Sequence, residues 1–289
     1  MLKAERLVAC HNAVGESPVW DASNARLLWL DIPNGRIQAW TESGLQTWDR
    51  ATPIGSIALA DDGGLIAATK EGFVALRLDP AGLLERSVAP VLVDQADLRL
   101  NDGACDRQGR FWSGSMALQP AAGSPLGRLY RLDGTMAEPV LDGFVVQNGL
   151  AWSPDGRTMY VSDSHASVQT VWAFDYDGER GVPTNRRQFI TGATLGGRPD
   201  GAAMDSDGCY WIAASDGGKL VRVTPSGIID AEVLVPTRNP TNLCFGGPGL
   251  RTMYITSLRG GPDSDAEAGN VFCFESPWQG APETPFATA

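Results

Sequence analysis

The stretch VVQNGLAWSPDGRTMYVSD, residues 145–163, contains the unit from which most of the chain is built. It has a polar residue (Asn148), a short apolar strand (residues 150–152), a Pro-Asp-Gly turn and a second apolar strand centred on Tyr160. Degraded copies of this pattern occur five more times along the chain. Short strands that repeat with a period of about 40 to 50 residues are typical of propellers and solenoids.

The second strand of each copy aligns the repeats. Its central residues are Trp29, Ile66, Trp112, Tyr160, Trp211 and Tyr254, at separations from 37 (Trp29 to Ile66) to 51 (Tyr160 to Trp211). A turn precedes each of these strands, as in SPDGR, and a third apolar strand such as GRLYRLD follows it. The sequence therefore predicts an all-β fold, a six-bladed β-propeller with at least three strands in each blade.

Composition agrees with one domain that spans residues 1–289. The chain has 34 Gly and 19 Pro, the turn density that many short strands require. Apolar stripes with a helical period of useful length are missing, which argues against helices of any size. Propellers and barrels commonly reach this length without dividing into smaller domains.

Charge and cysteine usage narrow the classes of partner. A formal net charge of −11 disfavours binding to nucleic acid or to anionic lipid. The amino terminus lacks the apolar core of a secretory signal, and no apolar run approaches the ~18 residues of a membrane span. Five cysteines, widely spaced and without a CxxC motif, are typical of reduced thiols. We therefore expect a soluble, cytoplasmic protein.

Each repeat places one residue 11 to 13 positions before its alignment residue, and we call these six residues the anchors. They are Glu16, Gly55, Asn101, Asn148, Asp200 and Asn242. Equivalent positions of a propeller lie at one height around its channel, so the anchors should converge on one mouth. Oxygen donors that face one axis form a site for a hard cation. The alternative is that each anchor is an ordinary turn residue before a strand.

Other chemistries find less support. Two histidines, His11 and His165, limit any histidine-rich zinc or iron site. The GxSxG, GxGxxG and P-loop motifs are missing. The DSDG stretch at residues 205–208 looks like part of a calcium loop, but it lacks the closing Glu, so a hairpin turn is expected. A Ser-His-Asp triad of Ser164, His165 and Asp163 remains open.

Six motifs carry a resemblance when taken together and in order. They are GESPVW (15–20), RLNDGACDRQGRFWSGSM (99–116), QNGLAWSPDG (147–156), NRRQF (185–189), RPDGAAMDSDGCYWIA (198–213) and NLCFGG (242–247). Through these six motifs the chain resembles the gluconolactonase/regucalcin family, also called the senescence marker protein family. The resemblance extends from about residue 5 to residue 275. The resemblance implies a six-bladed propeller with one divalent ion near the channel mouth, held by Glu16, Asn148 and Asp200.

The resemblance also implies substrate contacts and an activity. The sugar-binding Arg and Asn of the family fall on Arg99 and Asn101, whereas an acidic residue of some members is replaced here by Gln119. Arg99 has an alternative role, pairing at the surface with Asp97 or Asp102. Family members hydrolyse sugar lactones, and some have calcium-related roles or act on phosphotriesters.

We therefore predict a metal-dependent lactonase that opens glucono-, xylono-, arabinono- or galactonolactone to the aldonic acid. The divalent ion is Ca, Zn, Mn, Mg or Fe(II). Asp200 serves as a ligand and as the catalytic base, and a metal-bound water is the alternative for the second role. The expected partner is a small sugar lactone, and the expected assembly is a monomer. The alternatives are a non-catalytic ion-binding propeller and a phosphotriesterase-like hydrolase that uses the same site.

Overall fold

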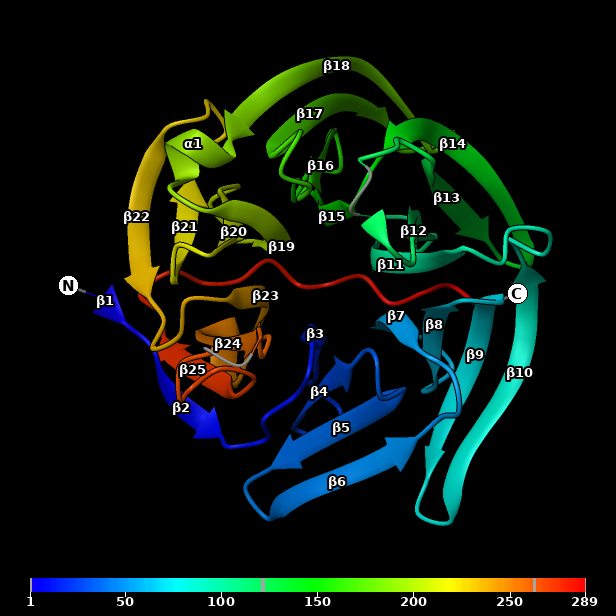
Figure 1. Ribbon diagram of the computed structural model, residues 1–289, viewed down its shortest axis with the longest axis horizontal. Coiled ribbons are helices and arrows are strands. Elements are labelled where there is room, and N and C mark those ends of the chain that lie inside the picture. The colour runs from blue at the N-terminus through cyan, green and yellow to red at the C-terminus, as the bar shows by residue number, and fades with distance from the viewer. Residues whose placement is uncertain (1, 121–122, 262–263, 289) are drawn as a thin grey trace.

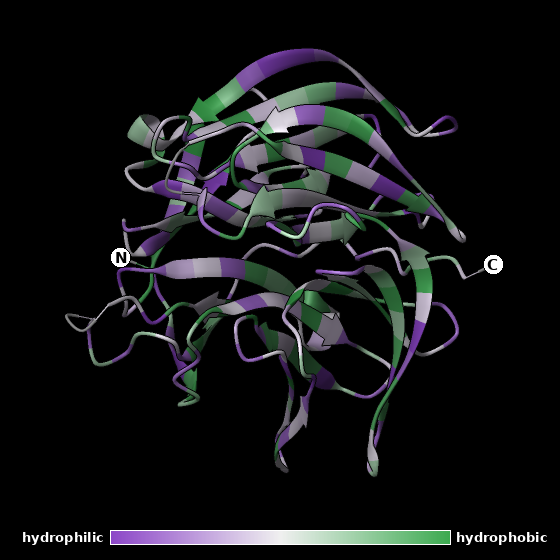
Figure 2. Ribbon diagram, turned by 45° about the vertical axis from the view of Figure 1, so that its right-hand side comes forward, coloured by the Kyte–Doolittle hydropathy of each residue, from purple (hydrophilic) through white to green (hydrophobic). Residues whose placement is uncertain are grey.

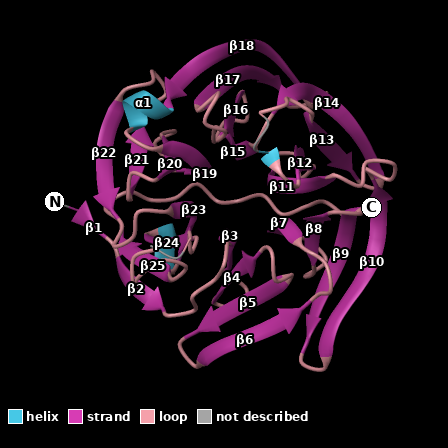
Figure 3. Ribbon diagram, viewed as in Figure 1, coloured by secondary structure: helices cyan, strands magenta, loops and turns pink. Residues whose placement is uncertain are grey.

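Six β-sheets stand around a central axis like the blades of a propeller (Figure 1). The computed structural model describes residues 2–120, 123–261 and 264–288. Strands and loops make up nearly all of the ribbon (Figure 3). The prediction of an all-β, six-bladed propeller is confirmed.

Four consecutive strands form each of the first four blades, running from the channel outward. Blade 1 has β3 (Gly15–Asp21), β4 (Arg26–Asp31), β5 (Arg36–Thr41) and β6 (Gly44–Asp49). Blade 2 has β7 (Ile54–Leu59), β8 (Leu65–Thr69), β9 (Gly72–Asp79) and β10 (Gly82–Pro90). Blade 3 has β11 (Leu98–Cys105), β12 (Phe111–Ala117), β13 (Gly127–Asp133) and β14 (Met136–Phe144). Blade 4 has β15 (Gln147–Trp152), β16 (Thr158–Asp163), β17 (Thr170–Asp177) and β18 (Val182–Thr191).

The amino-terminal segment closes the ring. Blade 5 has β19 (Arg198–Met204), β20 (Tyr210–Ser215), β21 (Lys219–Val223) and β22 (Ile229–Leu234), with β1 (Leu2–Lys3) parallel to β22. Blade 6 has β23 (Pro240–Gly246), β24 (Thr252–Ser257) and β25 (Val271–Glu275), and its outer strand is β2 (Glu5–Val8). Because the two ends of the chain share one sheet, the ring has no open edge between its first and last blades.

Buried aromatic residues of the second strands explain why the repeats are visible in the sequence. The side chains of Trp112 and Trp211 are 0% exposed, and each donates its indole N–H to the aspartate that opens the preceding turn. Asp205 accepts from Trp211 and from two backbone N–H groups of its own turn. The DSDG stretch is therefore a hairpin turn, as expected, and its first carboxylate is already fully engaged.

The outer strands were not predicted, because little apolar pattern marks them. β18 carries a run of exposed residues from Thr184 to Gln188, and β10 is exposed along its centre. Figure 2 shows hydrophilic and hydrophobic segments mixed along these outer strands. Their positions are set by hydrogen bonding to the third strand of the blade rather than by burial of a core face.

Residues 276–288 form a carboxy-terminal tail that crosses one end of the channel (Figure 1, red). Ala281 N donates to Met204 O at 3.0 Å on one side of the channel, and Phe286 N donates to Leu59 O at 2.7 Å on the other. The Phe286 side chain is 4% exposed and belongs to the core of blades 2 and 3. A cavity of about 80 Å³ lies between this tail and the channel-lining strands.

Helical turns are short, with α1 (Gly192–Leu195) between β18 and β19 and a 3-10 turn at Pro248–Leu250. All five cysteines are free thiols, as predicted. Within the described ranges, no helix is long and apolar enough to cross a membrane.

Candidate active site

The six anchors lie on the innermost strands β3, β7, β11, β15, β19 and β23, which contact one another around the ring. They were expected just before these strands, but the structure places them within the strands. A register shift contains or borders each anchor. The shifts lie between Glu16 and Val19, Ile54 and Ser56, Leu100 and Gly103, Asn148 and Ala151, Pro199 and Ala202, and Pro240 and Asn242. Because a bulge redirects side chains near the end of a strand, this recurring irregularity replaces the turn that the sequence suggested.

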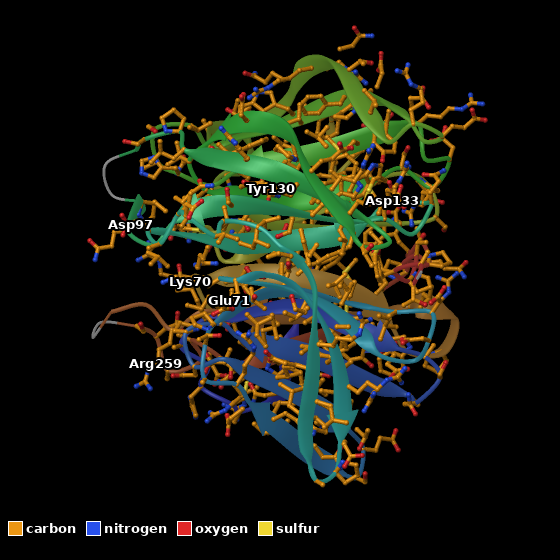
Figure 4. The ribbon with its side chains drawn as sticks, turned by 90° about the vertical axis from the view of Figure 1, so that its right-hand side faces the viewer. Lys70, Glu71, Asp97, Tyr130, Asp133 and Arg259 are labelled. Carbon is orange, nitrogen blue, oxygen red and sulfur yellow. The ribbon has the colours of Figure 1, made fainter. Side chains whose placement is uncertain are left out.

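A cavity of about 350 Å³ opens at the end of the channel opposite the carboxy-terminal tail. Five of the predicted site residues line it: Glu16, Arg99, Asn101, Asn148 and Asp200. Figure 4 labels Asp97, which precedes β11, on the same edge of the molecule as Lys70, Glu71 and Arg259. Asp133 lies toward the other side. The structure thus brings together side chains that are distant in sequence on one face of the propeller.

Gln119 does not join this group. Its side chain is exposed after the end of β12, and it is not part of the cavity wall, which includes the next residue, Pro120. The anchor Gly55 contributes no side chain, and a Cβ there would lie 2.4 Å from the Leu100 carbonyl oxygen. The tight approach of β7 to β11 therefore excludes a larger residue at that anchor.

Glu16 is a buried carboxylate without an ion pair among the described residues. Glu16 is 7% exposed. Its Oε2 accepts hydrogen bonds from Ser17 N at 2.8 Å and from Asn242 Nδ2 at 3.0 Å. Burial raises the pKa of Glu16 well above its usual value, and the nearby carboxylates of Asp200 and Asp102 raise it further. A positive charge beside such a group favours its ionised form.

Asp200 has a similar environment. Burial raises its pKa to about 7, against the opposing effect of Arg198, and the charge of Asp102 contributes in the same direction as burial. Arg198 Nη1 lies 3.9 Å from Asp200 Oδ2, while its Nε donates to Asp216 at 3.2 Å. Arg198 is therefore shared between two carboxylates and neutralises Asp200 in part.

Asp102 is a buried carboxylate that the sequence analysis considered only as a surface partner for Arg99, and it lines the smaller cavity beneath the carboxy-terminal tail. It is 7% exposed, and burial raises its pKa to about 6. Its Oδ1 lies 3.5 Å from Asn242 Nδ2, the same amide nitrogen that bonds Glu16. The position of Asp102 directly after Asn101 in the NDG motif was the signal available in the sequence.

Arg99 pairs with neither Asp97 nor Asp102, and it has no ion pair within the described part of the chain. Its Nη1 donates to Leu100 O at 3.0 Å and to Asn101 Oδ1 at 2.8 Å. Burial lowers the pKa of the Arg99 guanidinium to about 10. A half-buried guanidinium that faces a cavity without a carboxylate partner is available to an oxygen-rich ligand.

Two neighbouring amides continue from Arg99 around the ring. Asn101 Nδ2 donates to Gln147 O at 2.8 Å and to Asn148 Oδ1 at 3.1 Å. Asn148 Nδ2 donates to Ser164 Oγ at 2.6 Å, and Ser164 Oγ donates to Pro199 O at 2.6 Å. These bonds link the innermost strands β11, β15 and β19 and fix the side chains that face the cavity.

The Ser-His-Asp triad that the sequence left open is not formed. His165 Nδ1 bonds the Ser167 hydroxyl at 2.8 Å, whereas the Ser164 hydroxyl bonds Asn148 and the Pro199 carbonyl. Both oxygens of Asp163 accept from backbone N–H groups. Among the described residues, Ser164 has no histidine within a hydrogen bond, and the histidine that Ser167 contacts has no aspartate bonded to its other ring nitrogen, as such a nucleophile requires.

The residues present fit a divalent cation. Glu16 and Asp200 are buried carboxylates, and Asn148 Oδ1 adds a neutral oxygen, which is the donor chemistry that hard cations prefer. Glu16 has no ion pair among the described residues and Asp200 is only partly neutralised by Arg198, so burying both carboxylates is costly and a divalent ion would supply positive charge. Across the described residues, no group of three or more His, Cys, Asp or Glu side chains is arranged to hold a metal. A cation site in this cavity would therefore use the amide oxygen of Asn148 beside the two carboxylates.

The amino-acid sequence is similar to those of known proteins over most of its length. 6-Deoxy-6-sulfogluconolactonase from Pseudomonas putida is 40% identical over 251 residues, which cover 86% of this chain and 84% of that protein. Regucalcin from Oryctolagus cuniculus is 34% identical over 275 residues, which cover 91% of this chain and 90% of that protein.

Solved structures share the fold. A luciferin-regenerating enzyme has a TM-score of 0.91 at 24% identity, with 99% of this chain and 100% of that chain covered. A regucalcin from Agrobacterium tumefaciens has a TM-score of 0.90 at 23% identity, with 99% and 97% covered. Residues 14–259 also match the family model described as SMP-30/Gluconolactonase/LRE-like region. The chain therefore belongs to the SMP-30/gluconolactonase/LRE-like family, which its motifs predicted.

Proposed function

We propose that this protein is a metal-dependent hydrolase that opens a sugar lactone to the aldonic acid. The observation that carries the proposal is the convergence of Glu16, Asn148 and Asp200 on one cavity. The same cavity contains the guanidinium of Arg99, which has no ion pair among the described residues. The family and the relative named 6-deoxy-6-sulfogluconolactonase support a sugar lactone as the substrate class.

Glu16, Asn148 and Asp200 would hold the ion, which is one of Ca, Zn, Mn, Mg or Fe(II). When bound, such an ion supplies Lewis-acid stabilisation of the charge that forms on the lactone carbonyl oxygen. The two carboxylates contribute the negative charge, and Asn148 Oδ1 contributes a third oxygen without adding charge. Asn242 and Ser17 hold Glu16 Oε2 in place from the protein side.

Asp200 is the proposed catalytic base. In hydrolysis, water adds to the lactone carbonyl carbon, a proton leaves that water, and the bond to the ring oxygen breaks. The Asp200 carboxylate accepts this proton and then donates it to the ring oxygen, which becomes a hydroxyl group of the aldonic acid. Binding a cation lowers the basicity of Asp200, so its two roles compete. Arg198, at 3.9 Å, tunes the same balance by stabilising the ionised form.

Arg99, Asn101 and Gln119 are the proposed substrate-binding residues. Arg99 has guanidinium nitrogens that no described residue bonds, and these suit hydroxyl or acidic oxygens of a substrate. Asn101 acts through both its amide atoms, because one accepts from Arg99 and the other donates to Asn148. Gln119 lies outside the cavity wall and stays a prediction.

A panel of aldonolactones tests the proposal. Metal-free protein is prepared, single ions are added back, and ring opening is followed with a pH indicator. The panel contains neutral lactones and a 6-sulfo-substituted gluconolactone, since one relative is named for the latter. We expect turnover that a chelator abolishes and that falls in Glu16→Gln, Asn148→Ala and Asp200→Ala.

A matched control is Asp175→Asn, which removes an exposed carboxylate on β17 that bonds Asn185 and Arg187 and is not part of the cavity. This variant should hydrolyse the same lactones at the wild-type rate. Full activity in all three cavity variants, or in chelated wild-type protein, refutes the proposed mechanism.

A further inference from the structure

The hydroxyl of Ser164 determines which atom of the Asn148 amide can face the cavity. Ser164 Oγ lies 2.6 Å from the Pro199 carbonyl oxygen and 2.6 Å from Asn148 Nδ2. A carbonyl oxygen can only accept, so the single hydroxyl proton is committed to Pro199. The hydroxyl is then left to accept from Asn148, and the atom of Asn148 that faces it must be the nitrogen.

The other side of the amide leads to the same orientation. Arg99 can only donate, so the atom of Asn101 that it contacts is the oxygen. The Asn101 nitrogen therefore faces the Gln147 carbonyl, at 2.8 Å, and Asn148, at 3.1 Å. Asn148 must present its oxygen to this donor. An arginine and two carbonyl oxygens, none of which can reverse its role, thus fix both amides.

We propose that Ser164 is a positioning residue of the cation site, which holds Asn148 so that Oδ1 faces the ion together with Glu16 and Asp200. This inference rests on the proposed function. One lone pair of Asn148 Oδ1 accepts from Asn101, and the other is available to a cation. If the amide turned over, Nδ2 would face the ion, and an amide nitrogen is not a cation ligand. Ser164 is 1% exposed, so its hydroxyl makes these two hydrogen bonds away from bulk solvent.

The first test is Mn²⁺ binding to metal-free, full-length protein, measured by titration calorimetry. We expect Ser164→Ala to weaken Mn²⁺ binding by about 10- to 100-fold, the usual effect of removing a residue that orients a metal ligand. Ser257→Ala is the matched control. The Ser257 hydroxyl is also buried and donates to a backbone carbonyl, Asn270 O, at 2.7 Å, but Ser257 does not line the cavity. Its loss should leave Mn²⁺ affinity unchanged.

A shape-matched pair separates the hydroxyl from packing. Ser164→Thr keeps the hydroxyl, and Ser164→Val has the same shape without it. Threonine and valine have nearly the same volume, so any strain from the bulk added at residue 164 is common to the two variants. We expect Ser164→Thr to bind Mn²⁺ more tightly than Ser164→Val, by a factor close to that which separates wild type from Ser164→Ala.

A double-mutant cycle with Asn148→Asp tests orientation itself. A carboxylate presents an oxygen on either side, so the orientation of residue 148 no longer matters. In the Asn148→Asp background, Ser164→Ala should change Mn²⁺ affinity by less than about twofold, the usual limit of additive behaviour. A role of Ser164 in packing alone predicts the same loss of affinity in both backgrounds.

The outcomes separate this inference from the proposed function. If Ser164→Ala binds Mn²⁺ as tightly as wild type, or loses equal affinity in both backgrounds, Ser164 does not position Asn148, and the lactonase proposal is untouched. If wild type binds Mn²⁺ and the cycle behaves as described while no lactone is opened, the positioning role stands and the proposed function is wrong. If wild type binds none of Mn²⁺, Ca²⁺, Mg²⁺ and Zn²⁺, both are overturned.

Discussion

Replacing Asp200 by Asn should stabilise the metal-free protein at neutral and alkaline pH. Burial raises the pKa of Asp200 from its usual 3.8 to about 7, so the folded protein binds this proton more tightly than the unfolded chain does. A carboxyl group of this kind favours the folded state below its unfolded pKa. That contribution is lost as pH rises from about 4 to about 7. Asparagine does not titrate, so the Asp200→Asn variant loses nothing over this window.

The magnitude follows from the size of the shift. One pKa unit corresponds to about 1.4 kcal/mol, so a change from 3.8 to about 7 corresponds to about 4 kcal/mol. The Asp200 charge also raises the pKa of Glu16, so its removal relieves a second buried carboxylate. We therefore expect the stability difference between variant and wild type to grow by about 4 kcal/mol in favour of the variant between pH 4 and pH 8.

Urea unfolding of both proteins in chelator, at pH 4 and at pH 8, measures this difference. Asp175→Asn serves as a control of opposite sign, because Asn185 and Arg187 lower the pKa of the exposed Asp175. Its variant should be no more stable than wild type at pH 8. Adding a divalent ion at pH 8 should stabilise wild type more than Asp200→Asn. If the stability difference between Asp200→Asn and wild type is the same at both pH values, Asp200 does not have the buried, only partly neutralised environment described above.

Three further predictions test other parts of the structure. Phe286→Ala should cost about 3 to 5 kcal/mol in urea unfolding, because it empties a core position that fastens the carboxy-terminal tail across the channel; wild-type stability would show that the tail is not fastened there. Gly201→Ala should weaken Mn²⁺ binding in calorimetry, because a Cβ at residue 201 would lie 2.0 Å from the side chain of Asn242, which holds Glu16; unchanged affinity would contradict this contact. Arg99→Gln should raise the KM for a lactone more than it lowers kcat, and an effect on kcat alone would argue against a binding role.

The repeats could be predicted because the second strands bury a large apolar side chain in every blade, an aromatic one in five blades and Ile66 in blade 2. Trp112 and Trp211 combine burial with an indole bond to a turn aspartate, which leaves a fixed spacing in the sequence. The outer strands leave no such record, since half of the residues of a strand such as β18 are exposed. The path of the carboxy-terminal tail depends on single contacts, such as that of Phe286 with blades 2 and 3, that no local pattern encodes.

The convergence of four of the six anchors followed from circular symmetry: Glu16, Asn101, Asn148 and Asp200 line one cavity, whereas Asn242 lines the smaller cavity beneath the tail. Their local conformation did not follow, because a bulge within a strand and a turn before it use the same polar residues. Ser164 was considered only as a nucleophile. Its bond to Asn148 joins residues 16 positions apart on different segments, and that pairing becomes visible only in three dimensions.

The most direct test of the central claim is to locate the ion. Crystals of the protein soaked in Mn²⁺ would be measured for anomalous scattering, with a chelated crystal as the blank. We predict one anomalous peak in the channel mouth, about 2 to 2.6 Å from one oxygen each of Glu16, Asn148 and Asp200. A peak at any other position, or none in a crystal that has taken up Mn²⁺, would contradict the proposal that these three side chains form a cation site.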